Sequence, residues 1–152
     1  LLNVNMGIVK VTNPKKTKSS GLASIAGLWK FKEQDSISLF YGLQYTAFDI
    51  ELITNNSYYP GLMHQYIIPL QFDYDFKQFL ALAEFCLGYQ IFKKNKSITH
   101  NSNITKYNGF IISVGGGVSK LILPKIELGT KINLEFGKIS DVKLSVFTNF
   151  IF

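Results

Sequence analysis

Five charged residues lie within alternating apolar stretches, at positions that would share one face of a strand. This set comprises Glu84, Glu127, Lys131, Glu135 and Lys143. Side chains of a β-strand point alternately to its two faces, so all five would share the face that also carries Gly, Ser, Asn and Gln. Isolated charges are costly in a low-dielectric interior, and we therefore expect the five to pair with one another. Such a polar network could line a selective pore or form a structural plug of salt bridges.

The two histidines and the single cysteine are the other candidates for chemistry. His64 with Ser57 or Asp49 could form a general-base arrangement at a surface, although only the availability of these residues, and not their spacing, indicates it. His100 lies in a long polar stretch, and Cys86 lies in an apolar one. Two distant histidines and one cysteine make no metal-ligand set. The sequence therefore predicts no catalytic site, no metal site and no cofactor.

The elements that must position these residues are strands, because apolar and polar residues alternate with a period of two almost throughout the chain. Between Ile126 and Phe136, for example, one face carries Ile, Leu, Thr and Phe, while the other carries Glu, Gly, Lys and Asn. The pattern predicts eight strands and no convincing helix. These strands are Leu2–Val11, Leu22–Lys32, Ile37–Thr46, His64–Tyr74, Leu80–Phe92, Phe110–Ser119, Ile126–Phe136 and Lys143–Phe152.

Long and short connections alternate between these strands. The long ones are TNPKKTKSS, ITNNSYYPGLM and KKNKSITHNSNITKYN, and the shorter ones are EQDS, DFKQ and LILPK. Only the last link, GKISD, is short where a long one is expected. Meandering strands with long loops on one rim indicate an all-β fold, an eight-stranded antiparallel up-and-down β-barrel. The whole chain, residues 1–152, is expected to form this single domain.

Whether such a barrel is soluble or transmembrane depends on which face is apolar. Hydrophobic residues make up 47% of the chain and charged residues only 17%. The apolar faces are long and unbroken, whereas the opposite faces are small and polar, as a narrow interior requires. The small inward residues would be Gly42, Gly88, Gly115, Gly117 and Gly129. We therefore expect a transmembrane barrel with a filled interior, in which the charged residues form a plug; a narrow channel is the alternative.

Two further alternatives remain at this stage. A soluble, lipocalin-like binding barrel is suggested by Gly27-Leu28-Trp29, a match to the G-x-W triplet of lipocalins, although it falls on the second strand instead of the first. The membrane interpretation places Trp29 in an aromatic girdle at the short-turn rim, together with Phe31 and Tyr74. A rim enzyme is the other alternative, because His64 would lie at the long-loop rim, where some outer-membrane lipid-modifying barrels act through a surface histidine.

The last hairpin is expected to centre on Ile139. This centre would place Glu135 opposite Lys143 and Leu134 opposite Leu144. A shift of the centre by one residue would keep the two faces matched, because the pattern fixes only the parity of the pairing.

Basic residues concentrate in the predicted loops and explain much of the formal net charge of +6. They are Lys15, Lys16 and Lys18 in the first long loop, and Lys93, Lys94, Lys96 and Lys106 in the third. At an outer-membrane surface these side chains would contact the phosphates of lipopolysaccharide. Ordinary solvated loops are an equally good interpretation. Neither requires a nucleic-acid partner.

The middle of the chain, YIIPLQFDYDF followed by FLALAEFCLGYQI, resembles the PorT-like outer-membrane β-barrel family of Bacteroidetes. The matching residues are Ile68-Pro69-Leu70 and Gly88-Tyr89, with Met6-Gly7 and the segment from Gly42 to Tyr45 fitting the same layout. A basic residue that is usual after the first motif is replaced here by Asp73-Tyr74-Asp75. The resemblance implies an OmpA-like barrel in the outer membrane and supplies no catalytic residues.

Some members of that family belong to secretion or surface-lipoprotein machineries, so the resemblance also implies an accessory role in an outer-membrane complex. Partners would then be other outer-membrane proteins or lipoproteins. Candidate contact residues on the lipid-facing or rim surface are Tyr41, Tyr45, Tyr58, Tyr59 and Phe85. Ordinary lipid contact is the alternative for each of them.

The chain ends on the apolar stretch LSVFTNFIF. In a soluble protein this stretch would be an aggregation-prone edge, whereas in a barrel it pairs with the first strand. Its final aromatic residues, Phe150 and Phe152, resemble the C-terminal signal that barrel-assembly machinery recognises. Because the chain starts without Met and without a charged-then-apolar leader, we expect a mature chain delivered to the bacterial outer membrane.

Overall fold

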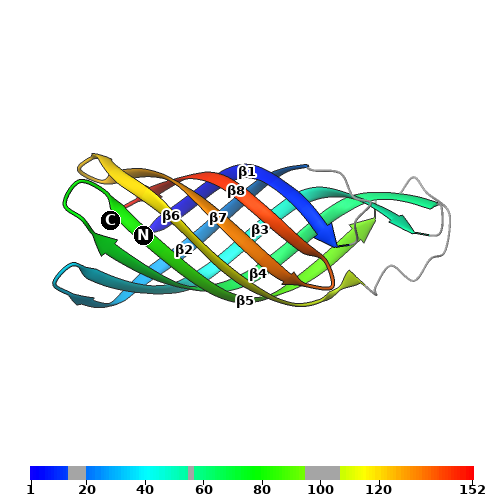
Figure 1. The fold of residues 1–152 in the computed structure, drawn as a ribbon, viewed down its shortest axis with the longest axis horizontal. Helices are drawn as coiled ribbons and strands as arrows, with labels where there is room; N and C mark the ends of the chain where they lie inside the picture. The colour runs from blue at the N-terminus through cyan, green and yellow to red at the C-terminus, as the bar shows by residue number, and fades with distance from the viewer. Residues whose placement is uncertain (14–19, 55–56, 95–106) are drawn as a thin grey trace.

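Eight antiparallel strands pair in sequence order, and the last pairs with the first to close a barrel (Figure 1). The computed structural model describes residues 1–13, 20–54, 57–94 and 107–152. The strands are β1 (Leu2–Asn13), β2 (Ser20–Gln34), β3 (Ile37–Thr54), β4 (Ser57–Asp75), β5 (Leu80–Lys94), β6 (Gly109–Leu123), β7 (Ile126–Gly137) and β8 (Ser140–Phe150). Across these described ranges, no helix has the length and apolarity needed to cross a membrane. The predicted fold class is confirmed.

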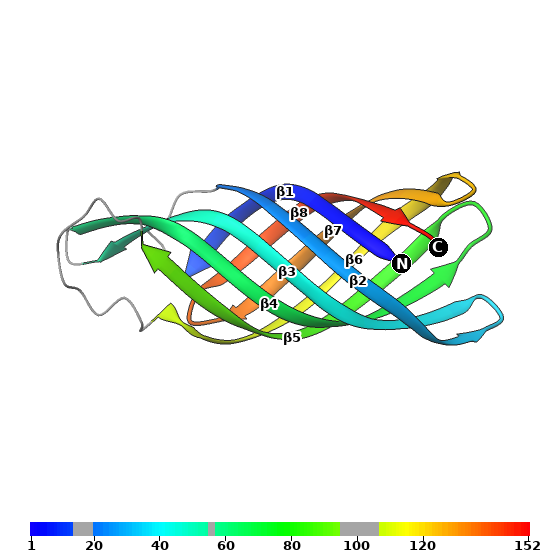
Figure 2. The ribbon, with the colours of Figure 1, turned by 180° about the vertical axis from the view of Figure 1, so that it is seen from behind.

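The barrel has two distinct ends. The connections after β2, β4 and β6 are tight turns, and both chain termini lie at that end, which we call the turn end (Figures 1 and 2). The connections after β1, β3, β5 and β7 lie at the opposite end, which we call the loop end. In eight-stranded outer-membrane barrels, the longer connections face the cell exterior and the short turns face the periplasm.

β3 and β4 are longer than the sequence pattern predicts. Their pairing continues from Ala47 opposite His64 to Thr54 opposite Ser57, so most of the predicted loop ITNNSYYPGLM is a two-stranded ribbon. β2 pairs with β3 only as far as Phe48, and the ribbon therefore extends past its neighbours at the loop end (Figure 2). The prediction of a loop was wrong because inward apolar residues within it, Tyr59 and Met63, continue the strand alternation.

The last hairpin also differs in register from the prediction. Glu135 lies opposite Asp141, and Leu134 lies opposite Val142, so the hairpin centres on Lys138 and not on Ile139. The faces are nevertheless the predicted ones, because a shift of the centre by one residue preserves parity. β8 ends at Phe150, two residues before the predicted end of the strand.

The outer face of the barrel is apolar, and the middle of its interior is polar. Met6, Leu43 and Ile68 on the outer face are 70%, 62% and 60% exposed, whereas Gln65 and Gln90 on the inner face are fully buried. A soluble barrel would have the opposite distribution. The soluble lipocalin-like alternative is therefore wrong, and the exterior is that of a transmembrane barrel.

Glycines make the narrow interior possible at the points of closest approach. A Cβ atom on Gly42 would lie 2.2 Å from the carbonyl oxygen of Gly27, and one on Gly117 would lie 2.2 Å from that of Thr130. No side chain fits at such distances. Both residues face inward, as the sequence pattern predicts.

Candidate functional site

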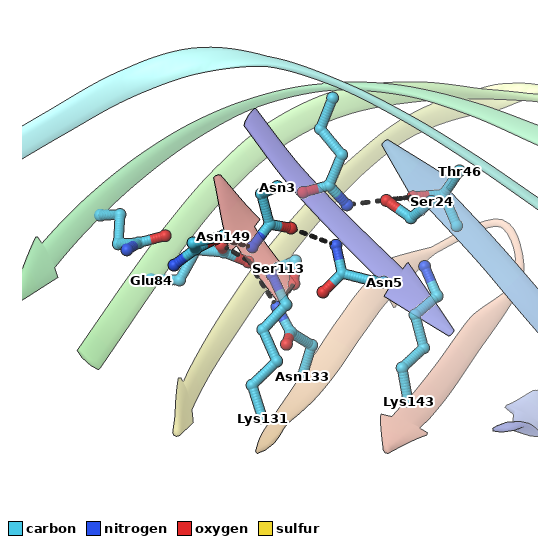
Figure 3. Close-up of polar contacts among 12 residues, drawn as sticks. Asn3, Asn5, Ser24, Thr46, Glu84, Ser113, Lys131, Asn133, Lys143 and Asn149 are labelled. Carbon is cyan, nitrogen blue, oxygen red and sulfur yellow. Dashed lines mark hydrogen bonds and ion pairs between the residues drawn. The ribbon is translucent and has the colours of Figure 1, made fainter. Parts of the chain in front are cut away.

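The five charged residues singled out in the sequence all lie inside the barrel, and none is more than 8% exposed. Lys131 on β7 places its ammonium nitrogen 3.0 Å from Oε2 of Glu84 on β5. The Asn133 side-chain amide donates to Oε1 of the same carboxylate at 2.7 Å. Glu84 therefore has a cation and an amide as partners, which offsets the cost of its burial (Figure 3).

A second ion pair lies nearer the loop end. Lys143 on β8 donates to Oε1 of Glu135 at 2.5 Å and also to the side-chain oxygen of Gln65. The amide of Gln65 donates in turn to Oε2 of Glu135 at 2.7 Å. Asp141 is 4.0 Å from the Lys143 ammonium, so one cation faces two carboxylates here.

Glu127 has an amide partner instead of a lysine. Asn149 on β8 donates to Glu127 on β7 at 3.1 Å, Asn3 on β1 donates to Asn149 at 2.5 Å, and Asn5 donates to Asn3. This chain of amides crosses the seam where the first and last strands close the barrel (Figure 3). These asparagines are not among the site residues predicted from the sequence, because that prediction rests on charged side chains; their inward parity is the signal that would have identified them.

A pocket of about 480 Å³ at the turn end reaches Glu127, one end of this network. Phe40, Asp73 and Glu127 are among its lining residues. Asp73 accepts a hydrogen bond from Gln71 at 2.8 Å. Apolar and charged side chains thus line the pocket together at the turn end of the lumen.

An apolar cluster fills the lumen at the loop end. Its buried members are Val9, Val11, Leu22, Phe48, Ile50, Leu52, Tyr59, Met63, Phe92 and Ile139, with Tyr107 packed against them. Tyr59, predicted as an outward partner contact, is 8% exposed and belongs to this cluster, so that prediction was wrong. β4 starts at Ser57, so Tyr59 and Met63 lie on the same strand. Because they are four residues apart, both side chains point to the inner face.

The outward-facing candidates occupy different levels of the wall. Tyr41, Tyr45 and Phe85 lie on the outer face, as expected for lipid or partner contacts. The side chain of Tyr58 lies outside the described residues. Trp29 is 52% exposed and its ring centroid is 5.9 Å from that of Tyr41.

The predicted girdle at the turn end is present as a belt of outward aromatic rings. Phe31 contacts Tyr41 edge-on at a centroid distance of 6.0 Å, and Tyr74 lies 4.6 Å from Phe76. Phe76 stacks on Phe79 at 4.9 Å. A belt of aromatic side chains near the end of a barrel is typical of the interface between lipid and water.

His64 faces outward from within β4, not from the start of the strand as predicted. Its Nδ1 atom lies 2.6 Å from the hydroxyl of Tyr45 on β3. Asp49 lies on the same outer face, opposite Leu62, but its carboxylate has no hydrogen bond to His64 among the described contacts. Ser57 has no described side chain, and His100 lies outside the described residues. The structure thus brings His64 together with a tyrosine and not with the acid that was considered.

The remaining candidates divide between described and undescribed parts of the chain. Lys93 is exposed on the outer face of β5. Lys94 belongs to β5 without a described side chain, and Lys15, Lys16, Lys18, Lys96 and Lys106 lie outside the described residues. Phe150 is the outward last residue of β8, and Phe152, just beyond it, is 89% exposed.

Cys86 is buried inside the barrel with Ile67 and Ile111. In the ranges that the structure describes, no group of three or more His, Cys, Asp or Glu residues is arranged to hold a metal ion.

Comparison with known proteins places the fold. No protein-family model matches the chain, and no curated protein is significantly similar to it in sequence. Among solved structures, Neisserial surface protein A superposes with a TM-score of 0.76 at 12% identity, covering 99% of this chain and 96% of that one. The attachment invasion locus protein Ail of Yersinia pestis, solved with the heparin analogue sucrose octasulfate, gives a TM-score of 0.63 at 10% identity, covering 98% of this chain and 96% of Ail.

The outer-membrane enzyme PagL is a third similar structure, with a TM-score of 0.57 at 10% identity and 99% coverage of both chains. At these identities the likeness concerns the fold alone. Together with the apolar exterior, it identifies the chain as a transmembrane β-barrel of the bacterial outer-membrane type.

Proposed function

We propose that this barrel has a structural or accessory role in a larger outer-membrane complex, such as a secretion, assembly or uptake machinery. The observation that carries the proposal is the filled lumen. The ion pairs of Glu84 and Glu135 cross its middle, and the apolar cluster crosses its loop end. A barrel whose interior is packed in this way acts through its outer wall, its loops and its partners.

The test is purification of the native protein in mild detergent, with identification of what accompanies it. We expect a stoichiometric outer-membrane protein or lipoprotein partner. Photoreactive residues at Tyr41 and Phe85, both outward, would locate the contact. A protein that remains alone after cross-linking in intact cells would contradict the accessory role.

The channel alternative has its own measurement. The protein is reconstituted in planar bilayers, and single-channel currents are recorded across a range of voltages. The proposal predicts no steady conductance, because an open path would require both the ion-paired layer and the apolar cluster to part. Steady, reproducible unitary currents would replace the plug interpretation with the channel one.

A lipid-modifying enzyme is the second candidate, favoured by one contact. The hydroxyl of Tyr45 holds the His64 ring on the lipid-facing wall, and an oriented imidazole is the usual starting point for general-base catalysis. PagL, which has the same fold, is described as an enzyme. Comparison of lipid A profiles between wild type and His64→Ala decides the question: our proposal predicts identical profiles, and an altered acylation pattern would favour the enzyme.

We further infer membership of the PorT-like family of Bacteroidetes from the two motif segments. Their proximity supports the inference, since Ile68 lies opposite Leu87 and Tyr66 lies opposite Tyr89, so the segments form one stretch of the β4–β5 ladder. Homologous sequences that keep Ile68-Pro69-Leu70 and Gly88-Tyr89 together would support the assignment. Homologues from unrelated bacteria that lack both would contradict it.

The assembly and surface partners are proposed on a similar basis. Barrel-assembly machinery would bind the aromatic residues at the end of β8, and lipopolysaccharide phosphates would contact Lys93 at the loop end. Phe150→Ala combined with Phe152→Ala should lower the fraction of protein that migrates as the folded form in unboiled gels. Unchanged folding in cells would remove the proposed signal.

A further inference from the structure

The outer wall carries a groove of about 950 Å³ whose lining is almost entirely apolar. Two parallel rows of outward side chains form its sides, and each row crosses the four strands from β3 to β6. The aliphatic row consists of Leu43, Ile68, Leu87 and Ile112, and the aromatic row consists of Tyr45, Tyr66, Tyr89 and Phe110. The aromatic row is the one nearer the loop end.

Two glycines line the groove. Gly88 lies between the two rows on β5, and Gly27 faces outward on β2, opposite Leu43. A Cβ atom on Gly27 would find its nearest neighbour, the Trp29 ring, at 3.6 Å, an ordinary van der Waals distance, so a side chain is tolerated here and the position is not a point of close backbone contact. The outward side of Gly27 therefore forms a notch at the β2 end of the groove.

The aromatic row is held rigid by contacts among its members and their neighbours. The ring centroids of Tyr45 and Tyr66 are 5.5 Å apart, and Tyr89 contacts Phe110 edge-on at 5.4 Å. The Tyr45 hydroxyl lies 2.6 Å from Nδ1 of His64, one outward position nearer the loop end. When Tyr45 donates this hydrogen bond, the neutral ring carries its proton on Nε2, which can donate to a ligand.

Polarity rises steadily from the groove toward the loop end. The aliphatic row is followed by tyrosines, then by His64, and then by the row in which Leu62 lies between Asp49 on β3 and Lys93 on β5. An anion would therefore be favoured on the β5 side, beside Lys93 and His64, and repelled on the β3 side by Asp49. The same gradient runs from the hydrocarbon to the headgroups of an outer leaflet.

We propose that this groove binds an acyl chain of lipopolysaccharide, with a lipid A phosphate held by Lys93 and His64. The aliphatic and aromatic rows contact the hydrocarbon, and the Tyr66 and Tyr89 hydroxyls lie at the level where the chain joins the sugar. The inference goes beyond the accessory role proposed above, because it assigns a specific lipid site to the wall regardless of any protein partner.

The test is native mass spectrometry of the barrel in mild detergent after addition of phosphorylated lipid A, dephosphorylated lipid A or phosphatidylglycerol. We expect retention of one phosphorylated lipid A per barrel, in preference to the other two lipids. Gly27→Leu, which fills the notch, should lower its occupancy about tenfold, a change of about 1.4 kcal/mol in binding free energy. Ala83→Leu, an outward substitution on β5 away from the groove, is the matched control and should leave the occupancy unchanged.

Two more pairs of variants make the test independent of any single substitution. Tyr89→Ala opens the aromatic side and should also lower occupancy, whereas Tyr74→Ala, an outward tyrosine at the turn end, should not. Lys93→Gln should abolish the preference for phosphorylated over dephosphorylated lipid A, and Lys120→Gln should not. Migration of boiled and unboiled samples on gels verifies that each variant is folded, and Tyr89→Ala decides the outcome if Gly27→Leu does not fold.

Three results would overturn the proposal. The first is lipid A retention that neither Gly27→Leu nor Tyr89→Ala changes. The second is equal retention of phosphatidylglycerol, with no effect of Lys93→Gln, which would identify ordinary boundary lipid. The third is a protein subunit cross-linked to photoreactive residues at Ile68 or Leu87 in the native membrane, which would mean that the groove is a protein interface.

Discussion

Lys143 and Glu135 form their ion pair diagonally across the β7–β8 ladder. In the register, Lys143 lies opposite Asn133, and Glu135 lies opposite Asp141. The long lysine side chain spans the offset and reaches the carboxylate at 2.5 Å. An ion pair inferred from a sequence pattern can therefore be present although the residues are not directly opposite.

This register can be tested with outward cysteine pairs. Leu134→Cys with Val142→Cys should form a disulfide on mild oxidation, because directly opposite residues have Cα atoms about 4.5–5.5 Å apart, within disulfide range. Leu134→Cys with Leu144→Cys, the pair from the predicted register, should not, since diagonal neighbours are about 7–8 Å apart. Gel mobility with and without reductant reports the result, and preferential cross-linking of the second pair would contradict the register.

The ion pair between Lys131 and Glu84 should matter most when only one partner is removed. Lys131→Met leaves the Glu84 carboxylate buried without its cation, and we expect a loss of about 3 kcal/mol in the free energy of unfolding. Combining it with Glu84→Gln should recover much of that loss, because no uncompensated charge remains. Unfolding in urea, followed by Trp29 fluorescence, measures the effect.

Lys120→Met is the control for this comparison, since Lys120 is exposed on the outer wall. It should change the free energy of unfolding by less than about 0.5 kcal/mol. Equal stability of the single and double variants at the Lys131 site would show that the carboxylate does not depend on the lysine.

Alanine at Gly117 should disrupt the barrel, whereas alanine at Gly27 should not. The new methyl group at position 117 would lie 2.2 Å from the Thr130 carbonyl oxygen, while at position 27 its nearest neighbour would be 3.6 Å away. We expect Gly117→Ala to lower the free energy of unfolding by about 2 kcal/mol or more, in the range of overpacked cores. Comparable stability of the two variants would mean that β6 and β7 can separate without cost.

Trp29, the only tryptophan, reports the depth of the turn-end girdle. Its exposed ring beside Tyr41 should lie at the lipid–water interface. In liposomes, lipids brominated close to the carbonyl should quench its fluorescence more than lipids brominated near the chain end. A Trp29→Phe, Leu43→Trp double variant should show the reverse order. Stronger quenching of Trp29 by the bromines near the chain end would mean that the girdle lies in the hydrocarbon and contradict this prediction.

The alternation of apolar and polar residues was sufficient to predict the architecture, because it shows which residues of a barrel strand face inward and which face outward. Ile126–Phe136 and the last strand alternate so regularly that their inner and outer faces follow directly. The inward position of Glu84 and Lys131 follows from the same rule. Parity does not fix the pairing partner, however, which explains the shift of the last hairpin.

The parts that could not be predicted have physical reasons. Asn, Pro and Gly in ITNNSYYPGLM signal a turn, and these signals concealed the continued alternation that places Tyr59 and Leu52 inside. The contact between Tyr45 and His64 depends on the pairing of β3 with β4, which no local pattern specifies. The outer groove likewise arises only when four strands align their rows.

The seam between β1 and β8 also determines when the molecule can be completed. Leu2 lies opposite Phe150, and Asn3 donates to Asn149, so the two strands farthest apart in sequence must meet. Contacts of such long sequence separation are formed at a high entropic cost and slow folding. The hairpins between neighbouring strands can form early, but the cylinder closes only after the last strand has emerged. Until then, the polar edges of β1 and β8 are open, and a catalyst that shields both edges would accelerate the slowest step.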